Sequence, residues 1–69
     1  MDSLFAERIR KLRKSRKISQ AGLGIALGVS RGTVSNWELG RRKLMLDDAI
    51  RIAKYFQVTV DSLLNLDKD

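Results

Sequence analysis

Apolar residues recur at intervals of three and four along most of this chain. This spacing places them on one face of an α-helix. Phe5, Ile9 and Leu12 start the pattern and predict a first helix that ends at about residue 15. No segment alternates apolar and polar residues as a half-buried β-strand does, and no repeat or linker interrupts the chain. The pattern therefore predicts an all-α protein with a single domain over residues 1–69.

Residues that favour helix ends divide the chain into segments. A Ser, Thr or Asp side chain can accept a hydrogen bond from a free N–H at a helix start, and Gly adopts the left-handed conformation that often follows a helix end. The candidate N-terminal caps are Asp2 or Ser3, then Ser19, Ser30 and Thr59, and the candidate terminating glycines are Gly28 and Gly40. These signals predict later helices at about residues 20–27, 31–39, 46–56 and 60–64.

Residues 19–40 contain two of these helices in immediate succession. Each is bracketed by Ser at its start and Gly at its end, and only a few residues form the turn between them. Val34 and Trp37 give the second helix an inward face, because they lie three residues apart. Gly24 is the small residue expected where two crossing helices approach closely. This arrangement is typical of a helix-turn-helix.

The two C-terminal helices are expected to close the hydrophobic core. The fourth helix carries apolar residues at helical spacing, and the short fifth helix adds two leucines. The residues expected inside are Leu46, Ala49, Ile50, Ala53 and Phe56 in the fourth helix, and Leu63 and Leu64 in the fifth.

The composition excludes several kinds of site. The 69 residues include no cysteine and no histidine, so the sequence has no disulfide and lacks the usual zinc ligands. Catalytic pairs built on Cys or His are excluded as well. Asp47 and Asp48 are neighbours on a helix and cannot face one site together. We therefore expect no enzyme activity, no metal and no cofactor, and no small-molecule substrate is evident.

No apolar run approaches the roughly 20 residues of a membrane-spanning helix, and no signal peptide is visible. The first helix is cationic and amphipathic, as membrane-surface helices are. The remaining helices, however, supply a core that would bury its apolar face. We expect a soluble cytoplasmic protein that does not enter a membrane.

The positive charge is unevenly distributed. The net charge is +6, and residues 1–43 hold 11 of the 14 basic residues but only 3 of the 8 acidic ones. This asymmetry favours an anionic partner for the N-terminal part. An ordinary solvated surface would look the same, so composition leaves both interpretations open.

One set of residues keeps a characteristic order and spacing along the chain: Arg13, Ser19, Gln20, Leu23, Gly24, Leu27, Gly28, Val29, Ser30, Val34, Ser35, Trp37, Glu38, Gly40, Arg41, Leu46, Ile52, Ala53, Phe56, Val58, Thr59, Leu63 and Leu64. In this order the chain resembles the DNA-binding domains of the phage-repressor/Cro type, also called the XRE type, over roughly residues 9–65. Two departures stand out: Leu44 replaces the usual Pro before the fourth helix, and Gly24 replaces the usual Ala.

The resemblance implies a compact five-helix bundle of the lambda-repressor-like type. It also implies a transcriptional regulator, in most cases a repressor, that binds a palindromic double-stranded DNA operator as a homodimer. An antitoxin or a protein-interaction module of the same fold remains an alternative. Arg13 and Glu38 match positions that pair in this family and are expected to form a structural salt bridge.

The second helix of the motif would then read base pairs. The major groove admits an α-helix, and Arg can bind guanine while Asn binds adenine, each through two hydrogen bonds. Arg31 and Asn36 fit these roles, although solvated residues would look the same, and Trp37 is expected in the core rather than as a stacking platform. For Thr33 and Ser35, phosphate contact and plain surface remain equal alternatives. The expected DNA-binding residues are Gln20, Ser30, Arg31, Gly32, Thr33, Ser35 and Asn36, with Arg41, Arg42 and Lys43 holding the DNA backbone.

Overall fold

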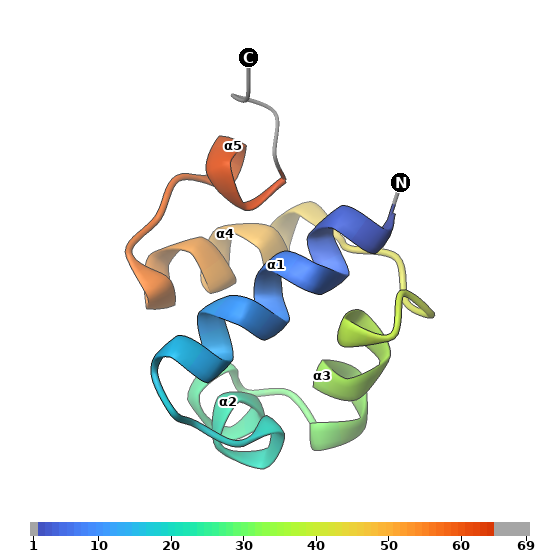
Figure 1. Ribbon diagram of the computed structural model, residues 1–69, viewed down its shortest axis with the longest axis vertical. Coiled ribbons are helices and arrows are strands. Elements are labelled where there is room, and N and C mark those ends of the chain that lie inside the picture. The colour runs from blue at the N-terminus through green and yellow to red at the C-terminus, as the bar shows by residue number, and fades with distance from the viewer. Residues whose placement is uncertain (1, 65–69) are drawn as a thin grey trace.

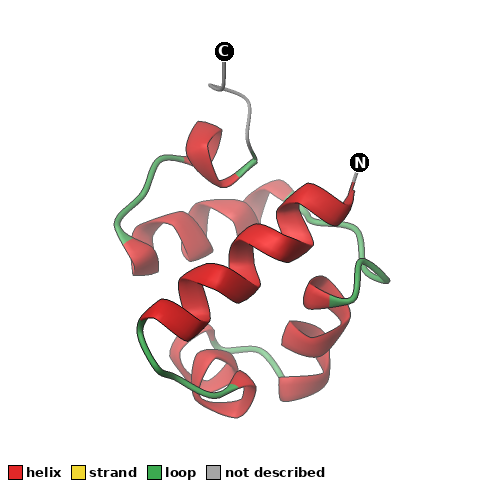
Figure 2. Cartoon of the chain, viewed as in Figure 1, coloured by secondary structure: helices red, strands yellow, loops and turns green. Residues whose placement is uncertain are grey.

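The computed structural model describes residues 2–64, with side chains from residue 5 onward, and this part of the chain folds into five helices without a strand (Figures 1 and 2). Asn65 and the rest of the expected domain, residue 1 and residues 66–69, lie outside the described residues. The all-α, five-helix prediction is confirmed. The helices are α1 (Asp2–Ser15), α2 (Gln20–Leu27), α3 (Arg31–Glu38), α4 (Leu46–Phe56) and α5 (Val60–Leu63).

The predicted helix boundaries agree closely with those observed. The bounds of α2 and α4 are as expected, whereas α3 and α5 each end one residue early, because Leu39 and Leu64 are their C-terminal caps. The proposed cap of α1 is wrong: the helix already includes Asp2 and Ser3, and a cap residue must precede the first helical residue.

The core forms where α1 crosses the other helices (Figure 1). Trp37 of α3 is fully buried, and Phe5 of α1 meets its ring edge-on with the ring centroids 6.5 Å apart. Trp37 is therefore a core residue, as the spacing predicts. The other fully buried large side chains are Ile9, Leu23, Val34, Ile52 and Leu63.

The buried face of α4 differs from the expected one. Leu46 is 67% exposed and Ile50 is 38% exposed, whereas Ile52 is fully buried. Apolar residues lie on two adjacent faces of this helix, and spacing alone cannot tell which face meets the bundle. The face that packs is the one formed by Ala49, Ile52, Ala53 and Phe56.

Three helices begin with the predicted side-chain caps. The hydroxyls of Ser19, Ser30 and Thr59 each accept a hydrogen bond from the N–H three residues later, at 2.9 to 3.0 Å. Gly28 and Gly40 both have positive φ angles, 75° and 72°, and follow α2 and α3 as expected. The two helices of the motif are thus delimited by their own sequence.

Arginine side chains tie several helix ends to neighbouring elements. Arg51 of α4 donates a hydrogen bond of 2.7 Å to the carbonyl of Leu27, the last residue of α2. Arg16 donates to the carbonyl of Phe56, the last residue of α4, and also lies over its ring. Arg8 of α1 donates to the carbonyl of Ser62 in α5. A cation is favourable at a helix C-terminus because the free carbonyls there carry partial negative charge.

The helices of the described part are short relative to a bilayer. None of them is both long enough and apolar enough to cross a membrane.

Gly24 is required by the close approach of α2 to the turn before α3. A Cβ atom at this position would lie 2.7 Å from the carbonyl oxygen of Val29, a main-chain atom that cannot move independently. A Cβ atom at Gly22, by contrast, would lie 3.2 Å from the side-chain oxygen of Ser19.

We expect Gly24→Ala to destabilise the protein by about 1 kcal/mol, because the cost of overpacking exceeds the gain in helix propensity. Gly22→Ala is the matched control and should stabilise it by roughly 0.5 kcal/mol, since only a side chain must adjust. Urea unfolding monitored by circular dichroism measures both. Equal effects of the two substitutions would contradict the steric account.

Candidate nucleic-acid interface

The outward face of α3 has a glycine near its centre. Successive residues of an α-helix are rotated by about 100°. Val34, Trp37 and Glu38 are the buried residues of this helix and define its inward side. On this rotation Gly32 and Asn36 lie nearly opposite that side, and both are exposed. The surface around Gly32 and Asn36 is therefore the side of the helix that faces away from the core.

The predicted reading residues surround this centre. Arg31 is exposed on one flank, with the half-buried Ser35 beside it, and the half-buried Thr33 lies on the other flank. Gly32 makes no packing contact that would require a glycine, because a Cβ atom there would meet only the Ser30 hydroxyl, at 3.7 Å. The structure thus leaves a long cation and an amide exposed on α3, with two half-buried hydroxyl side chains between and beside them.

Gln20, the first residue of α2, lies beside the start of α3. Its side-chain oxygen is 3.5 Å from Nη1 of Arg31, a long hydrogen bond. Its side-chain nitrogen donates to Oε1 of Glu38 at 3.1 Å. The amide is therefore held with its oxygen toward Arg31, and Gln20 and Arg31 form one group at the junction of the two helices.

The Ser30 hydroxyl is engaged within the turn. It accepts a hydrogen bond from the N–H of Thr33, and it lies 3.0 Å from the Thr33 hydroxyl. Ser30 is thus a cap in the first place, as expected. The two hydroxyls still have remaining hydrogen-bonding capacity, since a hydroxyl has one donor and two acceptor positions.

Arg13 and Glu38 form the ion pair that the resemblance implies. Nε of Arg13 lies 2.6 Å from Oε2 of Glu38, and its Nη2 lies 3.1 Å from Oε1. The two side chains are only 12% and 4% exposed. A third donor of Arg13, Nη1, reaches the carbonyl of Ile18 at 2.9 Å. Glu38 therefore joins α1, the start of α2 and the end of α3.

The hydrogen bond to Glu38 raises the pKa of Arg13 above its ordinary value, with the negative charge of Glu38 adding to the effect and burial opposing it. A raised pKa of a cation stabilises the fold at every pH below the ordinary guanidinium pKa, and this contribution is lost only above it. The positive charge of Arg13 thus persists throughout the neutral range.

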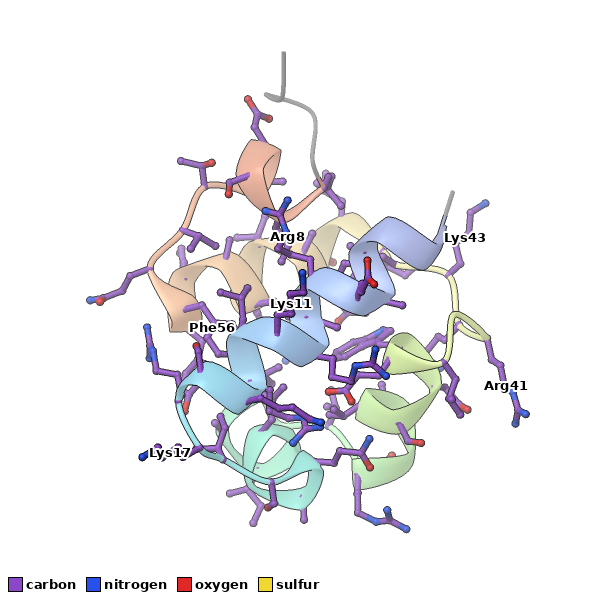
Figure 3. All side chains as sticks on the ribbon, viewed as in Figure 1. Arg8, Lys11, Lys17, Arg41, Lys43 and Phe56 are labelled. Carbon is purple, nitrogen blue, oxygen red and sulfur yellow. The ribbon has the colours of Figure 1, made fainter. Side chains whose placement is uncertain are left out.

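The basic loop after α3 is exposed, and its side chains point in different directions. Arg41, Arg42 and Lys43 are all exposed. Figure 3 shows Arg41 extending outward beyond the end of α3, whereas Lys43 points upward beside the N-terminal end of α1. The structure does not group Lys43 with Arg41. The hydrogen bond between Gln20 and Glu38 is a further feature that the sequence did not predict.

A helix-turn-helix family model matches residues 9–63, which is most of the chain. The chain belongs to this family. Its similarity to the Repressor protein C2 of Salmonella phage P22 is 39% identity over 64 residues, which cover 93% of this chain and 30% of that protein. Its similarity to the HTH-type transcriptional activator BcrR of Enterococcus faecalis is 36% over 61 residues, which cover 88% of this chain and 30% of that protein.

Solved structures of regulators have the same architecture as this helix-turn-helix domain. The P22 c2 repressor in complex with a synthetic operator superposes with a TM-score of 0.80 and 37% identity, over 86% of this chain and 89% of that one. The restriction-modification controller protein C.AhdI from Aeromonas hydrophila superposes with a TM-score of 0.82 and 27% identity, over 90% of each chain. The chain spans less than a third of the length of the curated C2 and BcrR proteins.

We expect Arg13→Leu to destabilise the domain by about 3 kcal/mol, because Glu38 is left buried without a cation. Urea unfolding measures the loss. The double variant Arg13→Leu/Glu38→Leu is the control and should recover much of the stability, since no unpaired charge remains. A double variant as unstable as the single one would show that the unpaired carboxylate is not the cause.

Proposed function

We propose that this helix-turn-helix domain binds double-stranded DNA in a sequence-specific manner and acts in transcriptional control, as a homodimeric repressor on a palindromic operator. The observation that carries the proposal is the exposed polar face of α3, which projects from a helix whose opposite side is buried against α1 and α2. A protruding helix with this face fits the major groove.

The residues on this face match the chemistry of base edges. Arg31 has the two parallel donors that guanine accepts, and Asn36 has the donor and acceptor that adenine requires. Ser35 and Thr33 are short enough to reach phosphates or bases beside them. Gln20 steadies Arg31 through its side-chain oxygen and lies at the N-terminus of α2, where the free N–H groups favour a phosphate.

Gly32 lets the helix approach the groove closely. A glycine in a helix costs as much as about 1 kcal/mol relative to alanine. Among the described residues no contact compensates for this cost, because a Cβ atom at Gly32 would meet only the Ser30 hydroxyl. The missing side chain on the exposed face is explained if another molecule comes close to the helix backbone there.

The exposed Arg41 and Arg42 next to this face supply contacts to phosphates. Such contacts position a protein on DNA without reading its sequence. Repression is the direction we propose because C2, which shares 39% identity with this domain, is named a repressor. We assign binding alone to the chain, with no catalytic step and no cofactor.

Selection of bound duplexes from a random pool, followed by footprinting, tests the proposal. We expect an enriched sequence with two inverted half-sites about 34 Å apart, one helical turn of DNA. A pool that shows no enrichment, at low salt and at several protein concentrations, would overturn sequence-specific binding. An asymmetric footprint over one half-site would overturn the dimer.

Arg31→Ala should weaken binding to the selected duplex by about 1–3 kcal/mol and relax the preference at one base pair. The reason is the loss of two hydrogen bonds to one base. Fluorescence anisotropy with the selected duplex and its single-base variants measures the effect.

Arg42→Ala serves as the matched control for Arg31→Ala. It should weaken binding to all duplexes alike and reduce the slope of log affinity against log salt by about one unit. If the two variants behave alike on selected and random duplexes, Arg31 does not read a base.

Gly32→Ala should change stability and binding in opposite directions. The helix gains about 1 kcal/mol of propensity, so thermal unfolding shifts upward. Binding to the selected duplex should weaken by roughly 1 kcal/mol or more, because a methyl group now separates the helix from the groove. Unchanged binding with raised stability would remove Gly32 from the interface.

A further inference from the structure

A cavity lies between α1 and the end of α3. Its volume is about 460 Å³, which falls within the range of roughly 300–1,000 Å³ that is usual for small-molecule sites. Figure 1 shows the end of α3 beneath the N-terminal half of α1, where these two walls of the cavity meet. The lining residues are Ala6, Glu7 and Arg10 of α1, and Glu38, Leu39 and Gly40 at the end of α3.

The α1 wall of the cavity carries two opposite charges that the fold does not use. Glu7 and Arg10 are both exposed and lie three residues apart on the helix. Neither forms an ion pair or a hydrogen bond with the described residues. Asp48 and Arg51 of α4, which are also three residues apart, do form an ion pair, at 2.8 Å. One anion and one cation therefore remain available to a ligand in this cavity.

The α3 wall adds partial negative charge. The main-chain carbonyls of Glu38, Leu39 and Gly40 lie at the C-terminal end of α3, and none accepts a hydrogen bond from the described part of the chain. Free carbonyls at a helix end attract cations. The carboxylate of Glu38, in contrast, is already engaged by Arg13 and Gln20. The helix end is thus the part of this wall that can hold a positive group.

Leu39 supplies an apolar surface to the same cavity. It is the C-terminal cap of α3 and is 59% exposed, so it does not fill the core. Ala6 on the facing wall is apolar as well. The space beside Gly40 is open, because no atom of another element lies within 4 Å of the position that its Cβ would take. An aliphatic group placed here would cover the exposed leucine and remove it from water.

Charges of both signs beside an apolar wall fit a zwitterion. A ligand with only a positive group would leave Arg10 without a partner, and a ligand with only a negative group would leave Glu7 without one. Residues three apart are separated by about 4.5 Å along a helix axis. An ammonium group and a carboxylate on one carbon atom can therefore reach both side chains at once.

We propose that this cavity binds a small zwitterion with an aliphatic body, of the class of the α-amino acids. The ammonium group lies at Glu7 and the free carbonyls of α3, and the carboxylate pairs with Arg10. The aliphatic body packs against Leu39 and Ala6. The site does not depend on the proposed function, because it lies between α1 and α3 and not on the exposed face of α3.

Binding at this site should be weak. The two ion pairs with the ligand are exposed, and exposed ion pairs contribute little. For a ligand of the size of leucine we expect a dissociation constant in about the millimolar range.

Three matched compounds test the class of ligand. L-Leucine carries both charges, 3-methylbutylamine has the same aliphatic body with the ammonium group alone, and 4-methylpentanoate has it with the carboxylate alone. Titration of the ¹⁵N-labelled protein, followed by NMR at constant pH and salt, measures their affinities. We expect L-leucine to shift the amide signals of Ala6, Leu39 and Gly40 in a saturable way. Each single-charge compound should bind about two to five times more weakly, because one ion pair is missing.

Two results of this titration would overturn the proposal. One is the absence of saturable shifts at Ala6, Leu39 and Gly40. The other is a single-charge compound that binds as tightly as L-leucine, since a zwitterion would then have no advantage.

Two charge-removing variants test the placement of the ligand. Glu7→Gln should bind L-leucine and 4-methylpentanoate equally, because the ammonium group no longer gains from a carboxylate. Arg10→Gln should bind L-leucine and 3-methylbutylamine equally, for the corresponding reason. Lys11→Gln is the matched control, since Lys11 is an exposed cation of α1 that does not line the cavity, and it should bind L-leucine as the unaltered protein does. Equal losses in Lys11→Gln and Arg10→Gln would contradict a specific role of Arg10.

Leu39→Ala tests the apolar wall. The side chain is largely exposed, so the melting temperature should change little. Affinity for L-leucine should fall about threefold, whereas affinity for glycine, a zwitterion without an aliphatic body, should stay the same. Equal losses for leucine and glycine, or no loss for leucine, would overturn the packing of the aliphatic body on Leu39.

Discussion

The buried carboxylate of Glu38 is the group on which the geometry of this domain depends. It accepts hydrogen bonds from Arg13 of α1 and Gln20 of α2, while its own main chain belongs to α3. An unpaired charge at a site that is 4% exposed would cost several kcal/mol. The three helices therefore cannot shift independently without leaving this charge unpaired. Gln20 links the same group to Arg31 through a long hydrogen bond of 3.5 Å.

The basic residues of the chain serve two purposes, and their number alone does not separate them. Arg8, Arg16 and Arg51 each donate to a main-chain carbonyl at or near a helix end, where partial negative charge accumulates. These arginines belong to the scaffold, as Arg13 does. The net charge of +6 therefore overstates the charge aimed at a partner. The basic side chains next to α3 differ from the other basic residues in where they point, and the number of basic residues does not show this difference.

The features predictable from sequence are those set by neighbouring residues. Ser19, Ser30 and Gly28 fix the ends of α2 and the start of α3 because each acts within its own turn. The buried face of α4 is not of this kind, since Ile52 and Ile50 are equally apolar and only the bundle decides between them. The hydrogen bond from Gln20 to Glu38 joins residues 18 positions apart and likewise has no local signal. Gln57 ends α4 with φ 59°, a conformation for which the sequence offers no glycine.

Some residues lower the stability of their own helix without a compensating contact among the described residues. Such residues indicate a contact with another molecule. Gly24 lowers the helix propensity of α2, but the fold explains the glycine. A Cβ atom at this position would lie 2.7 Å from the carbonyl oxygen of Val29. Among the described residues, no contact explains Gly32 or Met45 in this way, and each gives up as much as about 1 kcal/mol of helix stability. Losses of this size matter in a small domain whose net stability is about 5–15 kcal/mol. The two positions lie on either side of the basic loop along the chain, Gly32 in α3 and Met45 at the start of α4.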